Sequence, residues 1–426
     1  MTKRPVEIDS TPTDPFETHD FERQPPGTIL RDFETLLNLI GDQGMPVTPA
    51  HVFAMSSLET INRSLSHPLE LHLKRASQKS YPAINGLYLL VRATGLSSID
   101  TLSKQPRIML DPIALESWRS LNATERYFAL LKAWWGRGSE EIIGERRGWH
   151  MDVVWKLIEF RKRLPKTGIL TLATVRDTDP LRYYPGYYNL ALMDLFGLLE
   201  VRPQPPSAGQ GWLPGWVRVT DWGNTLLGSY SEFMKTALAC EVGSGLPMRG
   251  FVEEVDPWGC FEQWANSVRP RIPAWRKELQ LPAPIFRPDG HVFKVSLRVK
   301  CWRRIAIRGD AYLEQLAATI LDAFDFDSDH LYCFRYKDRF GRSVQIDHPY
   351  LAGDSDNTLT EDVKVGEIPL SKGTRIEFLF DFGDQWRFDI QIESIDFTGD
   401  IKTPQVLEKH GQAPSQYGDI DEQYDD

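Results

Sequence analysis

FLFDFGDQWRFDI, residues Phe378 to Ile390, is a dense apolar run interrupted by Asp-Phe-Gly-Asp. The segments on either side of the interruption, TRIEFLFDF (Thr374–Phe382) and WRFDIQIESI (Trp386–Ile395), alternate apolar and polar residues as half-buried strands do. A glycine inside a strand pattern marks a bulge or a tight bend, because glycine adopts positive φ angles without steric cost. The stretch therefore predicts two strands that meet at a bend centred on Gly383.

The side chains of the predicted bend allow a structural and a chemical interpretation. In the structural one, Asp381 and Asp384 cap exposed backbone amides, and Phe382 and Trp386 fill the core on either side. In the chemical one, Asp381 and Asp384 meet His330 to bind a divalent ion, Mg²⁺ or Mn²⁺ rather than zinc, or to share acid–base work. The chain has no HExxH motif, no paired-histidine spacing and no nucleophile elbow. The sequence therefore favours the structural role and assigns no metal or cofactor.

The segments around this bend predict an α+β domain over residues 290–400. Alternating residues indicate strands at VFKVSLRVK (Val292–Lys300), WRRIAI (Trp302–Ile307) and HLYCFRY (His330–Tyr336). Between the last two, AYLEQLAATILDAF (Ala311–Phe324) has the apolar spacing of an amphipathic helix. One helix against a mixed or antiparallel sheet is the expected architecture.

The order of these motifs points to a known family. Across residues 291–396 the chain resembles the plasmid open-reading-frame-three-like family. The motifs that carry the resemblance are, in order, WRRI, YLEQLAATILDAF, DHLYCFRY and FLFDFGDQW. The resemblance implies a compact α+β domain found near plasmids and insertion elements, and it assigns no catalytic residue. In the pattern of that family a histidine stands two positions after the tryptophan, where this chain has Phe388. This difference argues against a metal or proton-transfer role at that position.

Candidate binding residues fall in two places. In the C-terminal domain, Trp302, Trp386 and Arg335 are candidates to line a shallow groove for a partner chain or a nucleotide. Farther upstream, KLIEFRKRLPK (Lys156–Lys166) gathers four basic residues within one and a half helical turns. These are Arg161, Lys162, Arg163 and Lys166. A solvated helix face is the simpler interpretation of this basic run, and phosphate contact is the alternative.

An internal repeat organises the first half of the chain. YLLVRATGL (Tyr88–Leu96) and LALMDLFGL (Leu190–Leu198) align without gaps at an offset of 102 residues (190 − 88), and each ends an apolar helix at a glycine. Two short alternating strands follow each helix. Helices followed by a two-stranded hairpin are the winged-helix pattern, which predicts winged-helix-like units at residues 27–122 and 123–230.

The helices that precede the predicted hairpins offer few side chains for reading DNA. Groove insertion needs Arg, Lys, Asn or Gln directed at base edges. The first helix offers Asn85 and Arg92, and the second offers Asn189 and Asp194. RYYPGYYN (Arg182–Asn189) leads into the second helix with four tyrosines, which indicate an interface or packing platform and leave stacking on single-stranded bases open.

Composition and charge set the broad class. The 426 residues are 41% hydrophobic and 25% charged, which is typical of a globular chain with several folding units. A net charge of -10 argues against coating nucleic acid or membrane through the overall field. The opening has no signal-like apolar region and no run approaches the ~18 apolar residues of a membrane helix, so we expect a soluble, cytoplasmic protein with no membrane contact. The four cysteines lack CxxC spacing and are expected to be reduced.

The remaining segments complete a prediction of a multidomain α+β protein. Residues 1–26 and the acidic residues 401–426 are expected to be flexible tails, and residues 231–289 a helical, proline-rich connector. We expect a non-enzymatic accessory or scaffold protein associated with plasmids or insertion elements, which binds a protein or nucleic-acid partner through the winged-helix-like units and the C-terminal domain. The alternative is a metal-dependent hydrolase or nuclease that uses Asp381 and Asp384. The sequence indicates no oligomeric state.

Overall fold

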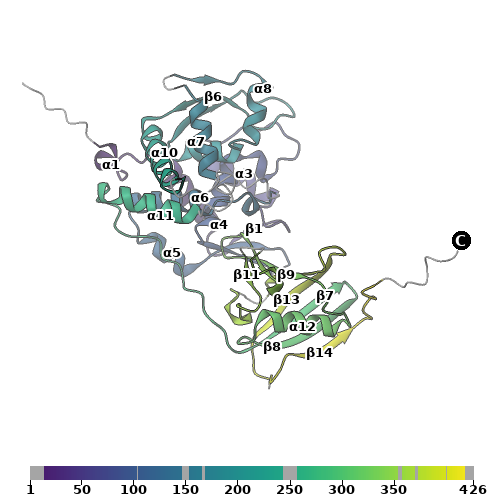
Figure 1. The fold of residues 1–426 in the computed structure, drawn as a ribbon. Coiled ribbons are helices and arrows are strands. Elements are labelled where there is room, and N and C mark those ends of the chain that lie inside the picture. The colour runs from purple at the N-terminus through teal and green to yellow at the C-terminus, as the bar shows by residue number, and fades with distance from the viewer. Residues whose placement is uncertain are drawn as a thin grey trace, which may run out of the picture. The chain divides into compact units, whose positions relative to one another are not determined.

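The chain folds into two compact units (Figure 1). A computed structural model describes residues 14–102, 104–145, 153–165, 168–242, 257–353, 357–369, 373–399 and 401–417. The N-terminal unit comprises Met1–Ile99 and Gln105–Leu281, and the C-terminal unit comprises Asp100–Lys104 and Pro282–Asp426. Among the described residues, no helix combines the length and the apolar character needed to cross a membrane.

The N-terminal unit contains the same order of elements twice. The first copy consists of α2 (Ile29–Ile40), β1 (Met45–Pro46), α3 (Met55–Ser64), α4 (Pro82–Ala93), β2 (Ser97–Asp100) and β3 (Arg107–Leu110). The second consists of α7 (Val153–Arg163), β4 (Leu170–Thr171), α8 (Val175–Thr178), α9 (Tyr187–Leu195), β5 (Leu199–Pro203) and β6 (Pro214–Val219). In each copy the third strand lies in the middle of a three-stranded sheet, with the orders β1-β3-β2 and β4-β6-β5.

Helices α4 and α9 end at the glycines that the repeat predicts. Gly95 and Gly197 follow the last turns with φ angles of 76° and 69°. This left-handed conformation costs glycine little, whereas a side chain would strain it. The amide of Gly95 donates to the carbonyl oxygen of Arg92 at 2.9 Å, and that of Gly197 donates to Asp194 at 2.9 Å. Both ends therefore close in the same way and release the chain into a hairpin.

The same two helices pack against each other inside the unit. Every residue of α4 except Ala83 is buried, and most of α9 is buried as well. The two backbones approach closely at Gly86, which faces Leu192 of α9. The two copies of the repeat thus share one core.

Further helices surround this pair. They are α1 (Pro15–Thr18), α5 (Pro112–Arg119), α6 (Ala123–Arg137), α10 (Asp221–Val242) and α11 (Pro257–Val268). Aromatic rings fill the space between α6 and α11, where Trp135 and Trp264 are fully buried with ring centroids 5.7 Å apart. Burial of such large rings makes α6 and α11 one packed layer.

Part of the segment predicted as a flexible tail, residues 1–26, is packed in this core. Phe16 and Phe21 are both buried, and the Phe21 ring lies 5.0 Å from the ring of Tyr127. These two phenylalanines stand within a polar, proline-containing stretch, so local composition gave no sign that distant rings would cover them. Residues 1–13 lie outside the described residues.

The segment predicted as a connector, residues 231–289, is largely part of the N-terminal unit. Trp264 and Trp275 are buried in its core, and the Trp275 ring stacks on Phe128 at 4.0 Å. The boundary between the units falls at Pro282, earlier than the predicted Gly290. The prolines of this segment suggested a connector, but its tryptophans provide enough apolar surface for it to pack.

The C-terminal unit is an eight-stranded mixed sheet with α12 (Leu313–Ala323) lying over one face (Figure 1). The strand order is β11-β10-β9-β12-β13-β7-β8-β14, and only β10 and β11 pair in parallel among these strands. The strands are β7 (Gly290–Arg298), β8 (Cys301–Arg308), β9 (Tyr332–Lys337), β10 (Ser343–Asp347), β11 (Thr358–Leu359), β12 (Arg375–Phe380), β13 (Trp386–Phe397) and β14 (Gln405–His410). The predicted helix and five of the strands match this layout, and the structure adds β10, β11 and β14.

Strand β14 lies within the segment predicted as an acidic flexible tail, residues 401–426. It pairs antiparallel with β8 and forms one edge of the sheet. Buried Arg303 fixes its end, because the guanidinium donates to the carbonyl oxygens of His410 and Gly411, each at 3.0 Å. The prediction was wrong for the described part of this segment, since a buried cation from another strand holds it. Residues 418–426 lie outside the described residues.

Candidate functional site

The Asp-Phe-Gly-Asp motif forms the loop of the β12–β13 hairpin. The Asp381 carboxylate accepts hydrogen bonds from the amides of Gly383 (2.8 Å) and Asp384 (3.3 Å), as the structural interpretation expects. The loop between Phe380 and Trp386 is centred on Gly383, as predicted, but the positive φ angles, 55° each, belong to Asp381 and Gln385 and not to the glycine. The predicted reason for the glycine was therefore wrong. Aspartate tolerates this conformation because its short side chain bonds to nearby backbone.

The other residues of the loop depart further from the expected roles. Phe382 is 41% exposed and does not fill the core, whereas Trp386 is half-buried and its ring lies 5.0 Å from Phe326. Asp384 is exposed, and none of the hydrogen bonds or ion pairs of the described residues involves its carboxylate. The family's histidine position, Phe388, is fully buried in the core.

His330 lies beside this loop, as the chemical interpretation requires. Its Nε2 is 3.6 Å from an Asp381 carboxylate oxygen and 3.8 Å from one of Asp329. The Tyr417 hydroxyl donates to Asp329 and lowers the pKa of that carboxyl. Asp384 does not join this group. Among the described residues, no set of three or more His, Cys, Asp or Glu side chains is arranged to hold a metal.

The three predicted groove residues of the C-terminal unit do not meet. Arg335 and Trp302 point away from the core and stand in one cross-strand row, Arg335 to Glu377 to Asp389 to Ser296 to Trp302. Four strand spacings separate them, about 19 Å. Trp386 lies on the other face, because it shares the orientation of the core residues Phe388 and Ile390 of its strand. Three side chains surround the Trp302 ring: Lys294 at 4.7 Å from its centroid, Arg304 at 5.3 Å and His410, stacked at 5.3 Å.

The basic run at the end of α7 is partly engaged with its own unit. Arg161 donates to the Asn224 side chain at 3.0 Å, and Lys162 pairs with Glu159. Arg163 lies 4.9 Å from the ring centroid of Tyr184. Lys166 lies outside the described residues. The described cations therefore contact neighbouring side chains of their own unit.

The polar residues of α4 and α9 are committed to internal hydrogen bonds. Asn85 accepts from the Gln78 side chain at 2.8 Å, and Arg92 donates to the carbonyl oxygen of Ser97 at 2.6 Å. Asn189 accepts from the Trp134 indole at 2.9 Å. A fourth residue, Asp194, accepts from the Val201 amide at 2.8 Å. None of the four is directed outward to read a base.

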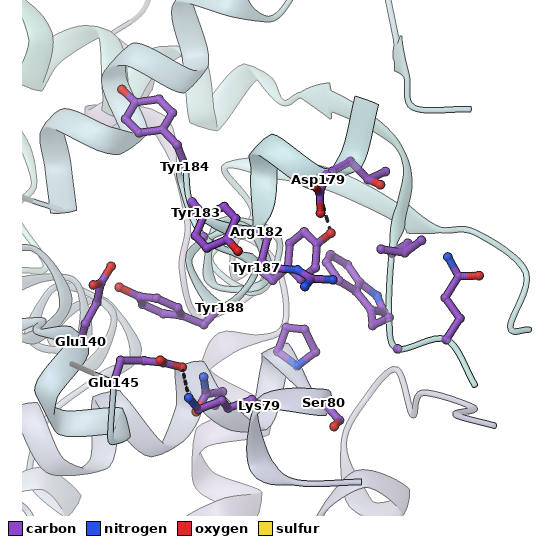
Figure 2. A pocket seen from close by; sticks show the side chains of 18 of the residues that line it. Lys79, Ser80, Glu140, Glu145, Asp179, Arg182, Tyr183, Tyr184, Tyr187 and Tyr188 are labelled. Atoms are coloured by element: carbon purple, nitrogen blue, oxygen red, sulfur yellow. Dashed lines mark hydrogen bonds and ion pairs between the residues drawn. The ribbon is translucent and has the colours of Figure 1, made fainter. Parts of the chain in front are cut away.

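A large cavity opens where these helices begin, and its wall contains the four tyrosines of the Arg182–Asn189 segment (Figure 2). Its volume is about 960 Å³, near the upper end for ligand sites. Tyr187 and Tyr188 lie on α9, and Tyr183 and Tyr184 precede it. Trp212, from the β5–β6 connection, packs edge-on against Tyr187 with ring centroids 5.4 Å apart. Aromatic faces thus make up much of the wall.

Charged side chains of both signs also line the cavity, and its lysines are paired. Lys156, which is buried, lies 2.8 Å from Glu140, and Lys79 lies 2.6 Å from Glu145 (Figure 2). Arg182 and Asp179 add one charge of each sign. Among the described residues of the lining, three cations and three carboxylates therefore balance.

Burial affects the pKa of two tyrosines of the cavity. Burial, reinforced by nearby Glu140, raises the pKa of Tyr188 far above its usual value. Burial likewise raises the pKa of Tyr187, which Arg182 partly offsets. The buried Tyr188 hydroxyl points toward Glu140 in Figure 2 and makes no hydrogen bond within the described part of the chain. It remains an available polar group in an aromatic wall.

Sequence reasoning identified only part of this cavity. The tyrosine-rich segment was predicted to be an interface or packing platform, and the structure places its four tyrosines in the cavity wall. Lys79, Glu140 and Trp212 come from segments 60 to 130 positions apart along the chain and carried no shared motif. Only their tertiary arrangement joins them, so no local signal could have found them.

One comparison with known proteins concerns the C-terminal unit. Residues 291–424 match the model of the family described as Plasmid pRiA4b ORF-3-like protein, as the motifs predicted. A search of curated proteins found no match. Among solved structures, the chain is similar to a protein of unknown function from Methanosarcina mazei Go1, with 17% identity and a TM-score of 0.26, over 29% of this chain and 71% of that one.

Proposed function

We propose that this plasmid-related chain is a non-enzymatic accessory protein that binds a protein partner through its N-terminal unit. The match of residues 291–424 to a plasmid-protein family is the premise for the plasmid association, and association with insertion elements follows from the same resemblance. The observation that carries the choice of partner is the tyrosine-lined cavity with balanced charge.

The two copies of the repeat are proposed to be winged-helix-like units that bind each other instead of DNA. The order helix, strand, helix, helix, strand, strand and the central third strand support this assignment. In winged-helix proteins that read DNA, the helix before the hairpin enters the major groove. Here these helices, α4 and α9, are buried against each other, and the four residues considered as base readers make internal hydrogen bonds. Groove insertion by either helix would require the core to open.

The cavity suits a protein better than a nucleic acid. A polyanion needs a surplus of cations, because phosphate neutralisation supplies most of its binding free energy. The cavity offers no surplus, and both of its lysines already contact carboxylates. Tyrosine and tryptophan, in contrast, are the residues that most often dominate protein interfaces.

The alternative enzyme remains a second candidate because His330 lies 3.6 Å from Asp381. Two observations argue against an enzyme. One Asp381 oxygen accepts hydrogen bonds from two backbone amides, and Asp384 does not join His330 and Asp381. The geometry supports a loop-capping role for Asp381 more directly than a catalytic one.

Two measurements test the proposal. The full chain is titrated against labelled duplex and single-stranded DNA over a range of salt concentrations, beside a variant with Arg161, Lys162 and Arg163 changed to Ala. We expect that the chain does not bind DNA in a salt-dependent way through these three residues. The triple variant should therefore behave like the unsubstituted protein. The opposite result is that the unsubstituted chain binds DNA with an affinity that decreases steeply as salt is added, and that the triple variant shows a weaker dependence on salt. That result would contradict the choice of a protein partner.

The second measurement is site-specific photocrosslinking in cells that express the full chain. A photoreactive aromatic residue replaces either Tyr183, which is 73% exposed at the cavity, or Tyr350, which is 85% exposed in the C-terminal unit. We expect a discrete protein adduct from position 183 and not from position 350. Nucleic-acid adducts at position 183, or equal adducts at both positions, would contradict the proposal.

A further inference from the structure

Trp212 stands at the junction of three hollows in the N-terminal unit. It lines the tyrosine cavity of about 960 Å³, a smaller hollow of about 190 Å³ and another of about 640 Å³. The first two also share Leu213, and the last two also share Leu69 and Pro203. The three hollows are therefore adjacent around Trp212, and together they are called the trough. Adjacent hollows can each take a successive residue of an extended chain.

Most of the carboxylates in the walls of this trough are already bonded within the chain. Glu140 and Glu145 of the tyrosine cavity are taken by lysines. In the third hollow, the buried Asp32 accepts from the Thr28 hydroxyl and from the Ser66 amide and hydroxyl, each at 2.7 Å. Glu200 there pairs with two arginines, Arg202 and Arg218. The carboxylates are therefore largely saturated.

The donors, in contrast, include groups that are not used internally. The Tyr188 hydroxyl is buried in the wall and makes no hydrogen bond within the described residues. Tyr183 exposes most of its surface at the same cavity. A ligand that satisfies such a wall supplies carbonyl acceptors and few N–H donors of its own. Proline residues have that property, since each retains its carbonyl and lacks an amide hydrogen.

We propose that the trough around Trp212 binds an extended, proline-rich segment of a partner protein. Proline-rich segments adopt the polyproline II conformation, whose carbonyls remain free and whose rings pack against aromatic side chains. Tyr183, Tyr187 and Trp212 supply such side chains, and the Tyr188 hydroxyl supplies a donor at depth. This inference rests on the proposed function, because it names the class of segment that the protein partner presents.

Charge supports a neutral segment of this kind over charged ones. The tyrosine cavity balances three cations against three carboxylates, so an Arg-rich, Lys-rich or phosphorylated segment would gain no net attraction there. A proline-rich segment brings no charge and loses little conformational entropy on binding, because its free form is already extended.

Fluorescence anisotropy with the full chain tests the inference. The probe is a dye-labelled peptide of repeated Ala-Pro-Pro, about twelve residues long, which corresponds to four turns of polyproline II. A peptide of repeated Ala-Ser-Gly of equal length is the control ligand. We expect the proline peptide to bind and the control to bind at least about fivefold more weakly. The variant Tyr183→Ala should weaken proline-peptide binding about fivefold or more, while Tyr350→Ala should leave it unchanged.

A second cavity variant separates a folding defect from a binding defect. Tyr188→Phe removes only the buried hydroxyl and keeps the ring, so we expect native thermal stability with weakened peptide binding. Equal binding of both peptides, no binding of the proline peptide, or equal effects of Tyr183→Ala and Tyr350→Ala would overturn the inference. In those cases a protein adduct at position 183 would still support the proposed function. If an oligothymidine probe binds and Tyr183→Ala weakens that binding, both the proline-rich segment and the proposed protein partner are overturned.

Discussion

Gly86 of α4 packs directly on Leu192 of α9: a Cβ atom at position 86 would stand 2.7 Å from the Leu192 Cγ. Leu192 is fully buried, so it has no open space into which to retreat. This contact is one of those that join the two copies of the repeat, and it limits how closely the helices approach at this point. It also identifies where that packing is most sensitive to a substitution.

Gly86→Ala is expected to lower the free energy of unfolding although alanine favours helices. The higher helix propensity of alanine contributes about 1 kcal/mol, whereas overpacking a filled core costs about 1–3 kcal/mol, so we expect a net loss of about 1 kcal/mol. Chemical denaturation of the full chain measures this change. The double variant Gly86→Ala with Leu192→Ala should lose less than the sum of the single variants, because the smaller residue accommodates the added methyl group. Strict additivity of the two changes would contradict the contact.

Substitutions in the β12–β13 loop distinguish the cap from a catalytic carboxylate. Asp381→Ala removes the acceptor for two amides at a position with positive φ, and we expect it to lower the free energy of unfolding by about 1–2 kcal/mol. Asp381→Asn retains an oxygen acceptor and tolerates the same backbone conformation, so it should remain close to the unsubstituted protein. Urea denaturation followed by tryptophan fluorescence provides the comparison.

Asp384→Asn is the matched control for the enzyme alternative. Its carboxylate is exposed, so we expect a stability change within about 0.5 kcal/mol and no response of the melting temperature to Mn²⁺ or Mg²⁺. If Mn²⁺ raises the melting temperature and Asp384→Asn abolishes that rise without unfolding the domain, the metal-dependent hydrolase becomes the better assignment.

Arg303→Met should release β14 from the sheet. The substitution leaves the carbonyl oxygens of Ala323, His410 and Gly411 without their buried donor, at an expected cost of about 2–4 kcal/mol. Hydrogen exchange followed by mass spectrometry should show faster exchange over Gln405–His410.

Arg308→Met, on the same strand, serves as its control. Arg308 is exposed and pairs with Asp310 and not with β14, so its loss should leave exchange over β14 close to that of the unsubstituted protein. Equal exchange rates at β14 in the two variants would show that the buried guanidinium does not hold this strand.

Asp194 gives the N-terminal unit a pH dependence. Burial raises the pKa of this carboxyl to about 6, although the Val201 amide partly offsets the rise. Between about pH 4 and 6, the Asp194 carboxyl is therefore protonated in the folded state and ionised in the unfolded state. The contribution to stability is complete below about pH 4 and is lost as the pH rises through 6. The size of this loss is about 2–3 kcal/mol.

Asp194→Asn removes this titration while it keeps the side-chain oxygen that accepts from Val201. We expect the variant to be more stable than the unsubstituted protein at pH 7.5 and to show a flatter stability profile between pH 4 and 6. Thermal unfolding across that range measures the difference. Parallel profiles for the two proteins would contradict the buried carboxyl as the source.

The C-terminal unit shows which elements can be predicted from local pattern. Strands β12 and β13 alternate apolar and polar residues because one face is covered, and that periodicity is visible in the sequence. Strand β14 is exposed along most of its length, so it has no apolar alternation to detect. Its position depends on pairing with β8 and on Arg303, a residue about a hundred positions away.

The N-terminal unit shows a different limit. The repeat at an offset of 102 was visible because each copy has its own apolar helix end and closing glycine. The packing of α4 on α9 depends on the complementarity of residues such as Gly86 and Leu192, which no single segment reveals. The tyrosine cavity has the same origin, because residues as distant as Lys79 and Trp212 form its wall.

The two edges of the C-terminal sheet bear on how this unit behaves at high concentration. At one edge stands β11, only two residues long, and at the other stands β14, which carries Glu408, Lys409 and His410. An incoming strand would find few free backbone groups at the first edge and would have to desolvate charges at the second. Neither edge is a good template for fibrillar growth, so the purified protein should resist polymerisation through this sheet.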